Sequence, residues 1–220
     1  MNLSISPQRS AFCCANRACR TGTVFTLLIL WFLTTLSVSA EEPSRLNSDQ
    51  ITQRFGSYAV EVMSQSESLR LANLYSTHDG VKICRTLALT AFQLPVAEDL
   101  MEADAAIREG ASIGATLRAA GWRVVKSDAA FAIATAGQQF AELSAGTVDV
   151  GSAVAVQVYS LQVSNGETRH PYAVIAEAYH PEHIPAGHDW QQAARPIEQV
   201  IESVPTTQKE ALSALASALN

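Results

Sequence analysis

Two segments of alternating apolar and polar residues, each divided by a tight-turn pair, form the clearest pattern along this chain. The first segment has its turn at Asp79-Gly80, and the second has its turn at Asn165-Gly166. Such pairs between alternating segments are typical of two-residue hairpin loops. The sequence therefore predicts two β-hairpins, with strands over Leu69–Thr77, Lys82–Gln93, Ala153–Val163 and Pro171–Tyr179.

Weaker patterns predict the remaining elements. Short alternating runs favour strands over Tyr58–Ser64 and Trp122–Lys126. Helical spacing and capping residues favour helices over residues 46–55, 98–108, 112–120, 190–203 and 207–219. The Ala-rich segment 127–147 is ambiguous, with a strand pattern over Phe131–Ala136 and a helical pattern over Gln138–Leu143. Sequential hairpins with inserted helices predict an α+β fold: a single domain with an antiparallel sheet of about six strands, helices packed on it, and C-terminal helices.

The first 40 residues have the composition of an export signal. Three arginines and an apolar run over residues 24–33 precede small residues that end at Ala40. We expect cleavage after Ala40 and release of residues 41–220 into the periplasm, with residues from about 186 to 220 as a helical extension of the domain. The alternative is an uncleaved anchor formed by residues 23–40, which would then be the protein's membrane contact.

The part that follows the leader is acidic and has one cysteine. The leader holds 3 of the 15 basic residues and none of the 21 acidic ones, which leaves 12 against 21 and a formal charge of −9. Because no Lys/Arg cluster is present, we expect no nucleic-acid binding. Three of the four cysteines lie in the leader, so Cys84 can form no intramolecular disulfide. We interpret Cys84 as an apolar strand residue in preference to a reactive thiol.

The sequence contains no strong signal for a metal or a cofactor. His180, His183 and His188 have a spacing that a metal could use, but Pro181 and Pro185 predict a turn-rich surface loop there. Phosphate-loop, dinucleotide and nucleophile-elbow motifs are absent. We therefore expect neither a metal nor a cofactor.

Three charged residues interrupt apolar strand rows: Arg70, Arg85 and Glu177. If the first hairpin has a two-residue loop, Leu74 lies opposite Arg85, and Arg70 shares their face at a separation of roughly 13 Å along the strand. Burial would raise the pKa of Glu177 unless a cation is near. Two interpretations remain open. The three charges form a buried ion pair between the hairpins, or they form a pocket for an anion.

Five short segments follow one another in an informative order: Ile51-Thr52-Gln53-Arg54-Phe55, Leu69-Arg70, Cys84-Arg85-Thr86, Ser112-Ile113-Gly114 and Ala176-Glu177-Ala178-Tyr179-His180-Pro181. With these segments the chain resembles bacterial chorismate lyase, and more loosely the ligand domain of related transcription regulators. The resemblance implies helices that cover a buried site for an aromatic acid. It implies that Arg70 and Arg85 bind substrate carboxylates and that Glu177 meets a ring hydroxyl. Backbone amides near Ile51 and at Ile113 and Gly114 would complete the anion site.

The resemblance implies elimination of pyruvate from chorismate to give 4-hydroxybenzoate. The two arginines would orient the dianionic substrate and stabilise the departing group, and Glu177 would assist proton movement. Export favours the alternative, because chorismate is made and used in the cytosol. That alternative is an exported, non-catalytic protein that binds or senses small aromatic carboxylic acids.

Overall fold

A seven-stranded sheet organises the part of the chain that the structure describes. The computed structural model describes residues 46–220 apart from 167, 185–189 and 191–193. Its strands are β1 (Ala59–Gln65), β2 (Leu69–His78), β3 (Val81–Phe92), β4 (Arg123–Thr135), β5 (Ala153–Ser164), β6 (Arg169–Tyr179) and β7 (Arg195–Pro196). Their order across the sheet is β1-β2-β3-β6-β5-β4-β7. Both predicted hairpins form, as β2–β3 and β5–β6, and β3 pairs antiparallel with β6 to join them.

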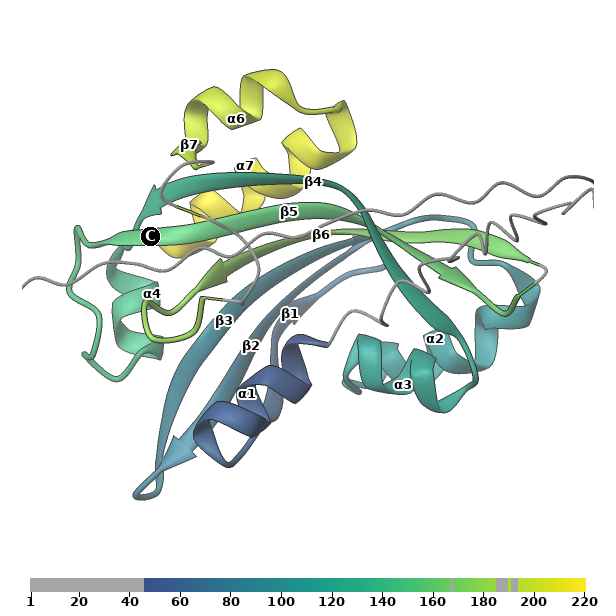
Figure 1. Ribbon diagram of the computed structural model, residues 1–220, viewed down its shortest axis with the longest axis horizontal. Helices are drawn as coiled ribbons and strands as arrows, with labels where there is room; N and C mark the ends of the chain where they lie inside the picture. Colours follow the sequence, from purple (N-terminus) through teal and green to yellow (C-terminus); the bar gives the residue numbers. More distant parts are fainter. Residues whose placement is uncertain (1–45, 167, 185–189, 191–193) are drawn as a thin grey trace, which may run out of the picture. The chain divides into compact units, whose positions relative to one another are not determined.

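Helices cover both faces of this sheet (Figure 1). They are α1 (Asn47–Phe55), α2 (Met101–Arg108), α3 (Ile113–Ala119), α4 (Gln138–Leu143), α6 (Ile197–Ser203) and α7 (Thr206–Leu219), with a 3-10 turn over Glu98–Leu100. In Figure 1 the C-terminal helices α6 and α7 lie on one side of the sheet, and α1, α2 and α3 lie on the other. The predicted α+β domain with C-terminal helices is therefore confirmed, with seven strands in a mostly antiparallel sheet.

The alternation of side chains along each strand separates two interiors. On the side of α4, α6 and α7, a core of apolar side chains includes Leu87 and Leu89 of β3 and Ala176 of β6. On the other side, α2 and α3 pack on a second core that includes Tyr159 of β5 and Ile175 of β6. Because neighbouring residues of a strand point to opposite faces, the same strands contribute to both interiors.

Two details differ from the sequence prediction. The ambiguous segment contains both patterns in succession, since β4 runs on to Thr135 and α4 begins at Gln138. The helix predicted over residues 190–203 is interrupted, because Arg195 and Pro196 form β7 and pair in parallel with Ala132 and Ile133 of β4, and α6 follows from Ile197. Proline has no backbone N–H to donate, and this suits both an edge strand and the residue before a helix.

A bulge in the first hairpin changes the predicted register. Next to the turn His78 pairs with Val81, as expected, and the register holds as far as the pair Tyr75–Cys84. It then shifts, so that Leu74 pairs with Thr86 and Arg85 is the extra residue. The predicted pairing of Leu74 with Arg85 is therefore wrong. A bulge leaves two residues of one strand opposite one of the other, and this shifts the face of every residue beyond it.

The leader, residues 1–40, lies outside the described residues. Contacts divide the chain into Met1–Ala40 and Glu41–Asn220, and all described residues belong to the second unit. Cleavage after Ala40 therefore stays a prediction. Among the described residues, no helix combines the length and the apolar character that crossing a membrane requires.

Candidate functional site

A cavity of about 80 Å³ lies on the face of the sheet that carries α1 and α3. A buried water needs roughly 10–15 Å³ by this kind of measure, so the cavity has room for a small organic molecule or several waters. Its walls are mostly apolar, and they include Leu46, Val60, Leu74, Val124, Leu161 and Ile175. The polar and charged residues in the lining are Asn47, Ser48, Tyr58, Arg70, Thr90, Ser112, Lys126, Tyr159 and Glu177. Mostly apolar walls with a few polar groups are typical of ligand sites.

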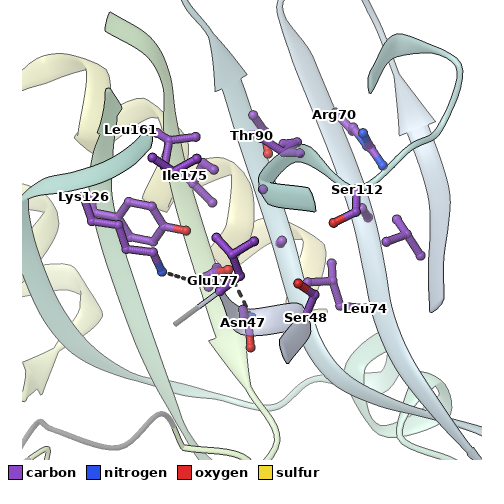
Figure 2. A pocket seen from close by; sticks show the side chains of 18 of the residues that line it. Asn47, Ser48, Arg70, Leu74, Thr90, Ser112, Lys126, Leu161, Ile175 and Glu177 are labelled. Carbon is purple, nitrogen blue, oxygen red and sulfur yellow. Dashed lines mark hydrogen bonds and ion pairs between the residues drawn. The ribbon is translucent and has the colours of Figure 1, made fainter. Parts of the chain in front are cut away.

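Arg70 is a buried cation at one end of this cavity. Figure 2 shows it beside Ser112, away from Lys126 and Glu177. Its side chain is 2% exposed. Nη1 donates to the carbonyls of Ile107 and Ala111, at 2.9 Å each, and Nη2 donates to that of Gly110 at 3.3 Å. These carbonyls lie in the last turn of α2 and just after it, where the helix dipole is negative.

The charge of Arg70 is only partly compensated by these contacts. Its Nε is buried without a hydrogen-bond partner, and no carboxylate of the described residues lies within 4.0 Å of the guanidinium. Burial lowers the pKa of Arg70, because desolvation disfavours the charged form. Carbonyl oxygens carry partial charges and cannot neutralise a full cation. An anion in the cavity would therefore stabilise Arg70.

Glu177 lies at the other end, and each oxygen of its carboxylate has a hydrogen-bond donor. Oε1 accepts from Asn47 Nδ2 at 3.1 Å, and Oε2 accepts from the Tyr179 hydroxyl at 2.5 Å. Lys126 Nζ stands 3.6 Å from Oε2 (Figure 2). Burial alone would raise the pKa of Glu177, but Lys126 and the hydrogen bonds from Tyr179, Asn47 and Tyr159 outweigh it and hold that pKa below its usual value. Glu177 is therefore ionised at neutral pH.

Lys126 was not singled out from the sequence, although its position contained a signal. It follows Val124 by two residues on β4, and both line the cavity, as the alternation of a strand requires. A lysine at an inward strand position marks a charge that needs a partner. Besides Glu177, its Nζ lies 4.0 Å from the centre of the Tyr159 ring, which is a cation–π contact.

Arg85 lies outside the cavity. Its Nε donates to Ser76 Oγ at 2.8 Å, and its Nη1 forms an ion pair with Glu182 at 2.9 Å. The guanidinium stacks 3.7 Å from the centre of the Phe55 ring, at the last residue of α1, whereas the cavity borders the first turn of that helix. The nine-residue helix separates these ends by roughly 12 Å. The structure therefore does not bring Arg70 and Arg85 together at this cavity.

Of the residues whose backbone amides the resemblance placed in the anion site, some line the cavity and one does not. Ile113 and Gly114, at the start of α3, line the cavity. Ile51 is fully buried in α1 but is not part of the lining. At the start of α1, Asn47 and Ser48 occupy the place expected for Ile51. The sequence did not predict Asn47 and Ser48 as site residues. It also did not predict a place in the site for Tyr58 and Ser112, whose hydroxyls hydrogen-bond to each other at 3.1 Å.

The histidines after β6 are structural where the structure describes them. His183 is buried, and its Nε2 lies 2.6 Å from Asn47 Oδ1. Because Asn47 Nδ2 donates to Thr86 and Glu177, Oδ1 is the acceptor and His183 Nε2 carries the hydrogen. His180 Nε2 lies 2.9 Å from Thr147 Oγ1. The prediction of a surface loop is therefore wrong for these two residues, while His188 lies outside the described residues.

The described residues contain no group of three or more His, Cys, Asp or Glu side chains that could hold a metal ion. Cys84 is fully buried in the core beneath α7, and burial raises the pKa of its thiol to about 12. Its interpretation as an apolar strand residue is confirmed.

Comparisons with known proteins found similarity to solved structures only. No family model matches the chain, and no curated protein matches it. Among solved structures, a GntR-family transcriptional regulator from Enterococcus faecalis is similar, with 16% identity and a TM-score of 0.35 over 60% of this chain and 96% of that one. The C-terminal domain of PhnF has 14% identity and a TM-score of 0.38, over 63% and 77% of the two chains. The C-terminal domain of a histidine utilization repressor from Pseudomonas syringae has 10% identity and a TM-score of 0.36, over 60% and 97%.

The expectation of lyase catalysis has to be corrected. The similar structures include a transcriptional regulator and a domain of a repressor, which belong to the looser part of the resemblance, and none of the three is named as a lyase. The prediction of chorismate-lyase catalysis is wrong. The geometry agrees with this correction, because Arg85 is away from the cavity and Glu177 is held ionised by its four partners. A general acid or base works best with a pKa near the operating pH, and Glu177 is shifted in the opposite direction.

Proposed function

We propose that this domain binds a small organic carboxylate in the cavity without chemical turnover. The observation that carries the proposal is Arg70, a buried cation in the cavity wall for which the described residues supply backbone carbonyls but no carboxylate. A buried charge is costly unless it is paired, and a ligand carboxylate supplies the missing charge.

The shape and chemistry of the walls favour an aromatic ligand. Apolar side chains from β1, β2, β4, β5 and β6 surround the space between Arg70 and Glu177. Tyr159 adds an aromatic ring to that wall, and Thr90 and Ser112 add hydroxyl groups. A flat apolar body with a carboxylate at one end matches this distribution. Apolar burial would provide affinity, and Arg70 would fix the orientation of the ligand.

The test is a thermal-shift and calorimetry series on the full chain with benzoate, 4-hydroxybenzoate and their neutral amides. We expect the acids to stabilise the protein and the amides to do so far less. At a ligand concentration of 100 times Kd the gain is about 2.7 kcal/mol, which corresponds to a rise in Tm of about 5–10 °C for a domain of this size. Recovered ligand should be unchanged by NMR.

Two arginine variants separate ligand binding from structural support. Arg70→Gln should lose the response to the acids, whereas Arg85→Gln, which also removes a buried guanidinium, should keep it relative to its own ligand-free Tm. Arg70→Lys keeps the charge and should retain part of the response. Equal responses of Arg70→Gln and Arg85→Gln would overturn the proposal, and so would equal stabilisation by acids and amides.

A further inference from the structure

The cavity contains an ion pair that already neutralises itself. Its lining has three ionised side chains, the cations Arg70 and Lys126 and the anion Glu177. Lys126 and Glu177 are joined at 3.6 Å, and Figure 2 shows this pair at the end opposite Arg70. Two cations and one anion leave one positive charge uncompensated. By position, that charge is Arg70.

Glu177 cannot easily release Lys126 or move away from it. Its side chain is buried, and Asn47 and Tyr179 hold its two oxygens. Asn47 is itself fixed by Thr86 and His183. A ligand group that reaches this end therefore meets one fixed negative charge and one positive charge, which together have no net charge.

We propose that the Lys126–Glu177 pair selects for monocarboxylates and against dicarboxylates, an inference that rests on the proposed function. One carboxylate compensates Arg70. A second carboxylate at the other end would lose its hydration and face Glu177, and nothing in the lining would remain to neutralise it. A neutral polar group there, such as an amide or a hydroxyl, can hydrogen-bond to the ion pair without adding charge.

The test compares ligands of equal shape that differ by one charge: terephthalate with 4-carbamoylbenzoate, and succinate with succinamate. Calorimetry on the full chain at pH 7 should show that the monoamide of at least one pair binds, at least about tenfold tighter than its diacid. Glu177→Gln leaves Lys126 without its anion and should reverse that preference. Glu182→Gln removes a carboxylate that pairs with Arg85 outside the cavity, and it should leave the preference unchanged.

Lys126→Met provides a second route if Glu177→Gln does not fold. It leaves Glu177 as an uncompensated anion, so both acids should bind more weakly and the diacid should lose more. Diacids that bind the wild-type protein as tightly as the monoamides would overturn the inference. The same conclusion follows if benzoate binds but neither monoamide does, or if the preference survives Glu177→Gln or Lys126→Met unaltered. Absence of any Arg70-dependent binding of benzoate would instead remove the proposed function, and this inference with it.

Discussion

The two faces of the sheet are built from alternate residues of the same strands, yet they differ in kind. On β3, Leu87 and Leu89 point into the core beneath α4, α6 and α7. Between and beside them, Ala88 and Thr90 line the cavity. On β6, Ala176 likewise belongs to the apolar core, whereas its neighbour Glu177 is a buried charge in the cavity wall.

This difference separates the sources of stability from the sources of recognition. The face that carries α7 is held by close apolar packing, which is sensitive to volume and insensitive to pH. The cavity face is held by charges and hydrogen bonds, including the chain from His183 through Asn47 to Glu177. Mutations on the first face should therefore change the free energy of unfolding, and mutations on the second should change ligand binding or its pH dependence.

The largest expected effect comes from truncation on the apolar face. Leu87→Ala removes a fully buried side chain and should lower the free energy of unfolding by about 2–5 kcal/mol. Leu74→Ala removes the same atoms from a residue that already borders a cavity, so fewer contacts are lost and the cost should be about 1–2 kcal/mol. Urea unfolding followed by circular dichroism measures both.

The affinity for benzoate should be changed more by Leu74→Ala than by Leu87→Ala, which is the reverse of their effects on stability. Leu87→Ala should bind benzoate with unchanged affinity once folded, and Leu74→Ala should bind it more weakly because the wall of the cavity recedes. Similar costs of unfolding for the two variants would show that the cavity face is packed as tightly as the other face.

A smaller effect is expected from acid, and it should originate on the cavity face. Burial lowers the pKa of His183 to about 4, from 6.5 in an exposed histidine. The unfolded chain therefore binds a proton at a pH where the folded chain does not. The stabilisation is complete above pH 6.5 and is lost as the pH falls towards 4, by on the order of 3 kcal/mol in all.

Unfolding measured between pH 7 and pH 4 checks this expectation. His183→Gln should flatten the profile over that range, and His78→Gln should not, because His78 is exposed at the first hairpin turn. Glu177 titrates lower: its folded pKa is depressed, so the stability it contributes is present above its unfolded pKa of about 4.5 and is lost only as the pH falls through the folded value. If the stability of His183→Gln depended on pH as that of the wild-type protein does, a group other than His183 would be responsible for the acid sensitivity.

The fold could be predicted largely from local signals. Asp79 and Gly80 both have the positive φ that a tight two-residue turn requires, and Gly166 has a positive φ in the second turn; both hairpins form at these places. The bulge at Arg85 could not be predicted, because an inserted residue changes the pairing without changing the composition of the strand. Because of that insertion the predicted pairing of Leu74 with Arg85 fails, and Arg85 is not part of the cavity lining.

The site could be predicted only in part, for a similar reason. Arg70 and Glu177 stood out as charges in apolar strands, and both line the cavity. The partners of Arg70 are backbone carbonyls of Ile107, Gly110 and Ala111. Every residue has such a carbonyl, so the residue types in the sequence do not show which carbonyls will point at Arg70. Asn47 contacts Glu177 across 130 positions of sequence, so its role depends on the tertiary structure. Lys126 was the exception, since its alternation with Val124 was visible in the sequence.

The smallest effect on stability is expected where α3 meets α1 at the cavity. A methyl group on Gly114 would stand 2.8 Å from Leu46 Cδ2, the far end of a flexible side chain, so Leu46 has to move. Gly114→Ala gains helix propensity of about 1 kcal/mol and loses a similar amount through this crowding, so the free energy of unfolding should change by less than about 1 kcal/mol. Leu46 also lines the cavity, and its displacement should weaken benzoate binding several-fold. Ala115→Gly makes the reverse change at an exposed position of the same helix, and it should lower stability by about 1 kcal/mol while leaving the affinity for benzoate intact. If both variants changed stability alone, the start of α3 would support the fold without shaping the ligand site, and the separation of the two faces would not extend to the helices.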